Sequence, residues 1–418
     1  MNREVVKNII REKQQEIAEI QFVKRNIFIE NSANYVFVGL RRAGKSYLMY
    51  QRIHELLEQG TNTMQEILFI NFEDERIREI KAAELGLILD AYKEMYNSKP
   101  IIFLDEIQNV EGWETFARRL ADSNYRIFIS GSNAKMLSRE IYTTLGGRFI
   151  AKEIFPFSFD EYLKYNKLEL DTNWQYGNEK TQTVNYFEKY FRFGGFAESF
   201  ALHDKRDWLN SLYHKILLGD IIARNEIRNE NTMRILVKKI AESVMHPVSL
   251  QKLKNIIETT GTTVSKNTLI DYLAYLNDAY LIFEMSNFSD KFVERETVKK
   301  RYFFDNGLLN LFLSDPNSRL MENIVALTLK KKYKEDVFYY NKNVEVDFYI
   351  PKEKSGIQVS FSISEFETRE REVNALLKLH NAFKLDKLQI ITYNEEKNIE
   401  IENVIIDVVP VWKWLLIQ

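Results

Sequence analysis

The sequence predicts an α/β fold that begins with a parallel sheet, and three observations carry this prediction. A loop with two glycines, residues 39–46, lies between a strand-like apolar run and a stretch with helical period. A second apolar run, residues 101–104, ends in two adjacent acids, Asp105 and Glu106. Strand and helix signals alternate as far as residue 154, which is typical of parallel strands joined by right-handed crossovers. Such a sheet binds its ligand at the carboxyl ends of its strands.

The loop has the pattern of a phosphate-binding loop, because the strand-like residues 35–38 precede it and a helical stretch, residues 46–57, follows. Backbone N–H groups of such a loop point at a triphosphate, and Gly39 and Gly44 permit its close approach. Lys45 is expected to reach the β- and γ-phosphates, and Ser46 to place its hydroxyl on Mg²⁺. The alternative is a turn that only caps the helix. The predicted nucleotide-binding residues are Gly39, Leu40, Arg41, Arg42, Ala43, Gly44, Lys45, Ser46 and Tyr47.

The two acids that follow residues 101–104 extend this prediction. Asp105 is expected to hold the Mg²⁺ shell through water, and Glu106 to orient or polarise the attacking water. Two acids at a strand end can also be solvated turn residues. The loop upstream favours the functional interpretation, because both features would meet at one edge of the sheet.

Further strand and helix signals lie between the phosphate-binding loop and residue 154. Strands are expected at residues 67–72, 126–129 and 149–154, and helices at 82–96 and 114–122. Ser130 and Ser132 follow the strand at 126–129, so either is a candidate sensor of the γ-phosphate or the lytic water. The alternative is a helix cap at this position, and the two roles are compatible.

Composition limits the class of protein. The 418 residues suffice for two to four domains, and 45% apolar and 13% aromatic residues predict a folded chain. A net charge of −2 implies no bulk attraction to nucleic acid or anionic membrane, and the lack of cysteine excludes disulfides and thiolate metal sites. The N-terminus lacks the apolar core of a signal peptide, and the apolar stretch 404–416 is too short to span a bilayer. We therefore expect a cytoplasmic protein without a membrane partner.

The middle of the chain has a different character. Residues 157–229 lack strand signals and carry aromatic residues at spacings suited to helix packing, with a break at Gly194 and Gly195, so a helical lid or linker is expected. Residues 230–290 fit a winged helix-turn-helix, with Ser249 and Ser265 as helix caps. Its reading helix would present Lys266, Asn267 and Thr268 to DNA. Only one of these is cationic, so a role in packing or protein contact is the alternative.

Several motifs in the chain resemble, in content and order, those of prokaryotic AAA+ ATPases whose C-terminal half is called domain of unknown function 4143. The motifs are Gly-x-Arg-Arg-x-Gly-Lys-Ser at 39–46, Asp-Glu-Ile-Gln at 105–108 with Trp113, Ser-Gly-Ser at 130–132, Gly-Arg-Phe at 147–149, Phe-Pro-Phe-Ser-Phe-x-Glu-Tyr at 155–162, Phe-Gly-Gly-Phe-Ala-Glu at 193–198, Asp-Ile-Ile-Ala-Arg at 220–224 and Phe-Asp-Asn-Gly-Leu at 304–308. Ala197 stands where the family usually has proline. The resemblance covers most of the chain and implies an ATPase core at residues 1–156 with ATP as the nucleotide.

The resemblance also gives Arg148 a role. An arginine at this position can act as a finger on the γ-phosphate of a neighbouring subunit, or as a sensor in its own site. It can equally be a surface arginine that pairs with a carboxylate. A homo-oligomer is therefore one expected partner.

The last part, residues 291–418, returns to strand and helix signals and resembles the restriction-endonuclease-like core found at the end of family members. Strands are expected at 337–340, 345–350, 356–361, 387–393 and 404–408, with a helix at 365–380. Glu322 and Asp347 would belong to the metal site of such a core, which also needs a Glu-x-Lys sequence. Gln358, Val359 and Ser360 stand there instead, so we expect a catalytically degenerate domain.

The sequence thus predicts an AAA+ ATPase whose Mg²⁺-dependent ATP hydrolysis is coupled to a conformational or assembly switch of its C-terminal recognition domains. The alternative is a DNA-binding regulatory or defence-related protein in which ATP controls contact with nucleic acid. A protein partner is also compatible with the sequence. Nuclease activity is disfavoured by the missing Glu-x-Lys residues.

Overall fold

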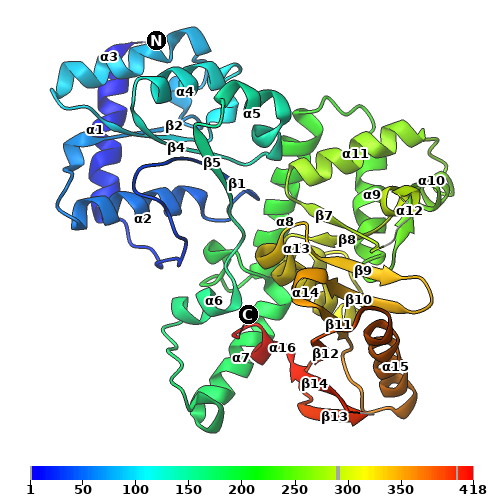
Figure 1. Ribbon diagram of the computed structural model, residues 1–418. Coiled ribbons are helices and arrows are strands. Elements are labelled where there is room, and N and C mark those ends of the chain that lie inside the picture. Colours follow the sequence, from blue (N-terminus) through cyan, green and yellow to red (C-terminus); the bar gives the residue numbers. More distant parts are fainter. Residues whose placement is uncertain (1, 289–291, 402, 418) are drawn as a thin grey trace. The chain divides into compact units, whose positions relative to one another are not determined.

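The computed structural model describes residues 2–288, 292–401 and 403–417, and it divides into two compact units (Figure 1). Unit 1 comprises Met1–Phe155 with Asp278–Tyr280, and unit 2 comprises Pro156–Asn277 with Leu281–Gln418. The first division of the chain therefore falls at residue 155, next to the expected end of the ATPase core. No described helix is long and apolar enough to cross a membrane.

Unit 1 is built on a parallel five-stranded sheet with the order β2-β3-β4-β1-β5. Its strands are β1 (Asn34–Val38), β2 (Ile67–Asn71), β3 (Ile101–Asp105), β4 (Arg126–Gly131) and β5 (Phe149–Glu153). Its helices are α1 (Arg3–Glu19), α2 (Lys45–Glu58), α3 (Gly86–Met95), α4 (Trp113–Asp122) and α5 (Arg139–Leu145). Every strand expected in this part is present, and the order places β1 between the central strand β4 and the edge strand β5.

An aromatic layer fixes one face of this sheet. The rings of Phe69, Phe103 and Phe128 on three adjacent strands stack in sequence, with centroids 6.3 Å and 4.7 Å apart. Phe37 of β1 continues the layer at 6.2 Å from Phe128. Met49 and other apolar residues of α2 pack into the same buried cluster. Because α2 is held against the sheet by this layer, the loop between β1 and α2 has two fixed ends.

Helix α1 was not expected from the sequence. Val6, Ile9, Ile10 and Ile17 are fully buried and lie on one face of this helix, against β2 and α3. Their spacing of three, four and seven residues is a helical period, so the signal was present in the sequence. The helix between residues 82 and 96 also differs, because a 3₁₀ turn at Ala82–Glu84 precedes α3.

Unit 2 begins with helices, as the loss of strand signals predicted. They are α6 (Phe159–Tyr165), α7 (Asn178–Phe193), α8 (Lys205–Lys215) and a π-helical segment, Ile216–Ala223. The aromatic residues of this part are mostly core: the rings of Phe187 and Phe191 in α7 lie 5.9 Å and 5.6 Å from that of Tyr393. The helical part thus packs directly onto the C-terminal sheet.

Three helices and a small sheet follow. The helices are α9 (Glu230–Glu242), α10 (Leu250–Glu258) and α11 (Lys266–Asp278), and the strands are β6 (Val248–Ser249), β7 (Ile282–Ser286) and β8 (Val298–Phe303) in the antiparallel order β6-β8-β7. The hydroxyls of Ser249 and Ser265 accept hydrogen bonds from the backbone N–H groups of Lys252 and Thr268. The boundary expected between residues 290 and 291 lies outside the described residues. In the sequence it separates β7 from β8, which pair in one sheet, and α12 (Phe292–Thr297) precedes β8.

The C-terminal sheet has six strands in the order β13-β14-β12-β11-β10-β9. The strands are β9 (Phe338–Asn341), β10 (Glu345–Ile350), β11 (Ser355–Val359), β12 (Lys387–Thr392), β13 (Lys397–Ile401) and β14 (Val404–Pro410). The helices after α12 are α13 (Asn306–Asn310), α14 (Asn317–Tyr333), α15 (Phe366–Phe383) and α16 (Val411–Trp414). Apolar residues of α15, such as Leu376, are buried against those of β12 and β14. Within this sheet, as far as the structure describes it, the edge strand β13 was missing from the expected set, and β8 of the small sheet was not expected either.

Two of the resembling motifs meet inside unit 2. The Asp305 carboxylate accepts hydrogen bonds from the backbone N–H groups of Gly195, Gly307 and Leu308. Gly194 has φ +74°, and a Cβ there would lie 2.1 Å from an oxygen of Asp305. These glycines are therefore explained by close packing between the end of α7 and the start of α13.

Candidate nucleotide-binding site

The loop between β1 and α2 has the backbone conformation that its glycines predict. Gly44 has φ +91° and immediately precedes the first residue of α2. A Cβ on Gly39 would lie 2.1 Å from the carbonyl oxygen of Ile154, which no side chain could tolerate. The loop therefore sits at the amino end of α2 and beside the end of β5, where an anion meets free N–H groups.

Lys45 lies inside this loop. Its ammonium is 3.1 Å from the carbonyl oxygens of both Gly39 and Leu40, and 3.7 Å from Oε1 of Glu106. The side chain is almost fully buried. A desolvated cation is thus held where a bound triphosphate would approach the loop.

Ser46 and Asp105 lie side by side, although 59 positions separate them in the sequence. The Ser46 hydroxyl donates to Oδ2 of Asp105 over 2.8 Å, and the Ser130 hydroxyl donates to Oδ1. Burial, followed by the nearby charge of Glu106, raises the pKa of Asp105 to about 6, while the two serines and Lys45 oppose this rise. A hydroxyl and a carboxylate in contact are oxygen donors that suit a hard cation.

Glu106 follows in a different environment. Its backbone is left-handed with φ +53°, which turns its side chain out of the strand pattern. Burial raises the pKa of Glu106, but the Lys45 charge and a hydrogen bond from Gln108 outweigh burial, so the pKa is below its usual value. The neighbouring acids therefore differ, because the pKa of Glu106 is lowered and the pKa of Asp105 is raised.

The two candidate serines have different contacts. Ser130 is completely buried and accepts a hydrogen bond from the Glu106 backbone N–H in addition to its bond to Asp105. Ser132 accepts a weak hydrogen bond of 3.4 Å from the Gln108 amide. The cap of the short helix Ala134–Leu137 is Asn133, whose side chain accepts from the Lys135 N–H. Neither serine makes this capping bond.

The other predicted loop residues lie around this centre. Arg41 forms an ion pair of 2.6 Å with Glu73, which follows β2, and its charge contributes to the lowered pKa of Glu106. Arg42 has φ +62° and occupies a turn position. Tyr47 is exposed at the start of α2, with its ring 5.6 Å from that of Tyr50.

Two residues near the site escaped the sequence analysis. Arg25 is buried and donates to the carbonyl oxygens of Ala43 in the loop and Phe155, at 3.1 Å and 3.0 Å. Gln108 donates to both Glu106 and Ser132. Gln108 belongs to the resembling motif, but Arg25 lies in a segment without a periodic pattern, so only the folded structure reveals its position.

Arg148 is not brought to this site within the chain. It precedes β5, whose first residue pairs with Asn34 at the start of β1, so it lies at the amino edge of the sheet. The loop lies at the opposite, carboxyl edge. The Arg148 guanidinium pairs with Asp122 at the end of α4 and is one-third exposed. Within one chain, Arg148 thus lies at the opposite edge of the sheet from the phosphate loop.

The acids of the C-terminal sheet do not form an open metal cluster. Among the described residues, no group of three or more His, Cys, Asp or Glu side chains could hold a metal ion. Gln358 is buried in β11, and its amide donates to Glu372 over 2.7 Å, while the Ser360 hydroxyl donates to the carbonyl oxygen of Ser362. The residues in place of Glu-x-Lys thus serve local hydrogen bonding.

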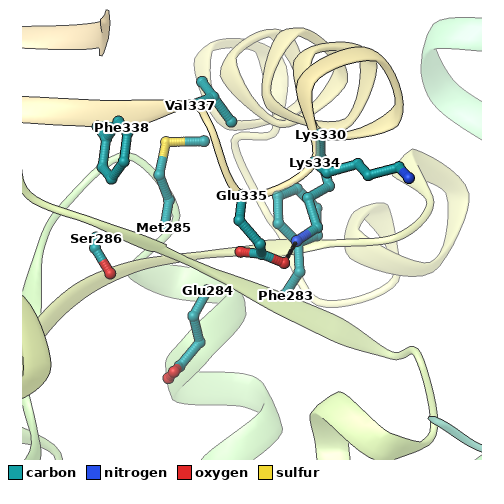
Figure 2. A pocket seen from close by; sticks show the side chains of 9 residues that line it. All are labelled: Phe283, Glu284, Met285, Ser286, Lys330, Lys334, Glu335, Val337 and Phe338. Atoms are coloured by element: carbon teal, nitrogen blue, oxygen red, sulfur yellow. Dashed lines mark hydrogen bonds and ion pairs between the residues drawn. The ribbon is translucent and has the colours of Figure 1, made fainter. Parts of the chain in front are cut away.

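A small pocket of about 30 Å³ also lies in unit 2 (Figure 2). Its lining residues come from β7 and from the end of α14 and the segment that follows: Phe283, Glu284, Met285, Ser286, Lys330, Lys334, Glu335, Val337 and Phe338. Lys330 and Glu335 pair with each other across it. This pocket has no part in the phosphate loop.

The fold and the loop define a nucleotide-binding protein of the AAA type. The sheet order and the loop geometry agree with a match of residues 31–163 to the family described as "AAA domain". Residues 184–319 match "Domain of unknown function (DUF8612)", which is a different label from the domain of unknown function 4143 that the resemblance implies.

The chain belongs to the same family as the uncharacterized protein MJ1544 of Methanocaldococcus jannaschii. The two are 36% identical over 412 residues, which cover 94% of this chain and 91% of the relative. An uncharacterized protein of Haemophilus influenzae is 30% identical, over 91% of this chain and 94% of its own length. The Walker-type ATPase PABY2304 of Pyrococcus abyssi superimposes with a TM-score of 0.41 at 16% identity, covering 74% of this chain and 95% of that one. A likeness of that degree adds nothing to the functional argument.

Proposed function

We propose that the protein binds ATP with Mg²⁺ and hydrolyses it, and that the nucleotide state controls a conformational or assembly switch of unit 2. One observation carries the proposal: an ionised, buried carboxylate, Glu106, lies 3.7 Å from the lysine of the phosphate loop. A base at this distance from a phosphate-binding cation is placed to act on a water molecule beside the γ-phosphate.

Each residue of the site then has a separate role. Lys45 would exchange its bonds to the loop carbonyls for the β- and γ-phosphate oxygens. Ser46 and Asp105 would hold Mg²⁺, which supplies charge neutralisation at the phosphates, and the raised pKa of Asp105 would fall when the cation binds. Ser130 would fix the orientation of Asp105, and Ser132 with Gln108 that of Glu106.

Arg148 is assigned a role in trans. Its guanidinium lies on the surface, at the sheet edge remote from its own loop, and its present partner Asp122 is itself 46% exposed. An exposed ion pair of this kind contributes only about 0–1 kcal/mol, so a neighbouring subunit's γ-phosphate could compete for the arginine. This role requires a homo-oligomer.

The decisive experiment compares ATP binding and turnover in the parent chain, Glu106→Gln and Lys45→Ala, with the molecular mass measured in each nucleotide state. We expect Glu106→Gln to bind ATP and turn it over about 100- to 10,000-fold more slowly, because the substitution keeps the size and removes the base. Equal turnover per bound ATP in this variant and the parent would refute the assignment of Glu106. If the molecular mass were the same in all nucleotide states, a nucleotide-controlled change of assembly would be excluded, and a conformational switch would be the form of the proposal that is left.

A second candidate function, ATP-controlled DNA binding, is favoured by one observation. In this candidate function, helices α10 and α11 and the small sheet β6-β8-β7 would form a winged helix, and Lys266, Asn267 and Ile270 are exposed along one side of α11. Asp271 on the same helix is also exposed and would repel phosphate. Duplex affinity should therefore be modest and should fall steeply with salt. Lys266→Ala with unchanged duplex affinity would exclude α11 as the reading helix.

A further inference from the structure

A lysine occupies the place where the resemblance to an endonuclease-like core implies a divalent cation. The Lys300 ammonium lies 3.0 Å from Oδ1 of Asp347, 3.2 Å from Oε1 of Glu322 and 3.4 Å from Oε1 of Glu345. Its side chain is fully buried. Three elements, β8, α14 and β10, supply these groups.

The alternation of β8 directs Lys300 to this centre. Successive residues of a strand point to opposite faces, so Lys300 and Tyr302 share one face and Arg301 lies on the other. Arg301 pairs with Glu284 over 2.8 Å, whereas Tyr302 donates its hydroxyl to the same Glu322 oxygen that Lys300 contacts, over 2.7 Å. One strand therefore supplies both a cation and a donor to the acids.

Asp347 already makes two hydrogen bonds to β11. The second oxygen of Asp347 accepts from the Val359 backbone N–H over 3.0 Å, and Oε1 of Gln358 accepts from the Asp347 N–H over 2.8 Å. Mg²⁺ needs near-octahedral oxygen ligands at about 2.0–2.1 Å, and an ammonium between the carboxylates prevents such an approach. The residues present do not fit a bound metal.

The charges of the centre explain why a cation is needed there. The Lys300 ammonium lies within 3.2 Å of an oxygen of both Glu322 and Asp347, and the Glu322 side chain is only 1% exposed. Without Lys300, two carboxylates would face each other in a dry interior.

We propose that Lys300 is a built-in cation that replaces the divalent metal of this centre, so that unit 2 keeps the acidic residues of a nuclease as a metal-independent joint between its two sheets. The missing Glu-x-Lys residues and the presence of Lys300 are then consistent with each other, because the ammonium supplies the positive charge that a bound cation would bring to these acids. It follows that removing this charge, and leaving the acids in place, opens a site for a divalent cation.

The test is a Mn²⁺ titration of the full-length, nucleotide-free chain, carried in an Asp105→Asn background that removes the carboxylate of the phosphate-loop site. Mn²⁺ is the probe because it accepts carboxylate oxygens, and its free concentration is measured by electron paramagnetic resonance. Lys300→Met is expected to bind one equivalent of Mn²⁺ at least about tenfold more tightly than the background chain. Lys299→Met is the matched control, since Lys299 is the preceding residue of β8 and pairs with Glu284 on the opposite face.

Two results would overturn the proposal. One is Mn²⁺ binding by the chain that retains Lys300, with loss of that binding in Asp347→Asn. The other is a folded Lys300→Met that binds no more Mn²⁺ than the control. If Lys300→Met does not fold alone, Mn²⁺ should restore its folding transition, and Lys300→Met with Glu322→Gln should fold without metal. If neither Mn²⁺ nor the Glu322→Gln substitution restored folding of Lys300→Met, the proposal would also be refuted. The loss of folding would then have a cause other than the uncompensated carboxylate charges.

Discussion

Replacing Asp105 with asparagine should stabilise unit 1 at neutral pH while abolishing Mg²⁺-dependent turnover. Asp105 is completely buried, and the charge of the adjacent acid Glu106 adds to the effect of burial on its pKa. Asparagine keeps the shape, and the hydroxyls of Ser46 and Ser130 can rotate to pair with its amide. The substitution therefore removes a buried charge without removing its hydrogen-bonding partners.

The magnitude follows from the raised pKa. The pKa of Asp105 is about 6 in the folded chain against an ordinary value of 3.8, so ionising it in the folded state costs about 3 kcal/mol. Because the folded state binds this proton more tightly than the unfolded state, the parent is most stable below pH 3.8 and loses this stability as the pH rises to about 6. The gain from asparagine should therefore be about 3 kcal/mol at pH 7.5 and about 1 kcal/mol at pH 4.5.

Hydrogen exchange of the amides in β1, β3 and β4, measured at several urea concentrations, reports the free energy of unfolding of unit 1 alone. Asp90→Asn is the control, because Asp90 is about half exposed and should change stability by no more than about 0.5 kcal/mol. A gain that is absent, or that is equal at the two pH values, would show that Asp105 carries no buried charge in the folded chain.

Three further predictions follow from the geometry. Lys45→Ala should weaken ATP binding about 10- to 150-fold, from lost charge-assisted bonds worth about 1.5–3 kcal/mol, and calorimetry that finds a change within about twofold would contradict the loop assignment. Arg148→Ala should leave ATP affinity intact and abolish turnover, and mixing it with Lys45→Ala should restore partial activity; a co-assembled mixture without activity would exclude the trans role. Gly194→Ala should destabilise unit 2 by at least about 2 kcal/mol in urea denaturation, because its Cβ would meet Asp305 2.1 Å away at φ +74°. An unchanged urea midpoint of Gly194→Ala would show that the contact between the end of α7 and Asp305 accommodates a Cβ without loss of stability.

Local patterns in the sequence predicted the phosphate loop and the acids after it. Gly39, Gly44 and Lys45 belong to one turn, whose conformation depends on near neighbours, and the run at 101–104 is too apolar to be anything but a buried strand. Residue spacing also predicted all five strands of unit 1, because a buried parallel strand is a short continuous apolar run. The edge strand β13 alternates between partly buried and exposed residues and gave no such run.

The partners that act across long sequence distances were beyond the reach of such patterns. Arg25 contacts Ala43 from a segment with no period, and Lys300 meets Glu322 and Asp347 only because β8 lies beside both α14 and β10. The position of Arg148 is another example. Its motif suggested a place near the nucleotide, but the direction of β5 put it at the opposite edge of the sheet.

The sequence by itself determined that this protein has a phosphate-binding loop, an acidic strand end and an α/β core, since each depends on residues a few positions apart. The tertiary structure alone decided which charges meet. Asp105 and Glu106 are adjacent in sequence, yet burial and the Glu106 charge raise the pKa of Asp105 against the effect of two serines, while Lys45 and Gln108 lower the pKa of Glu106. Electrostatic energy depends on distance and burial, which chain order does not specify, and so the chemistry of the acids is a property of the fold.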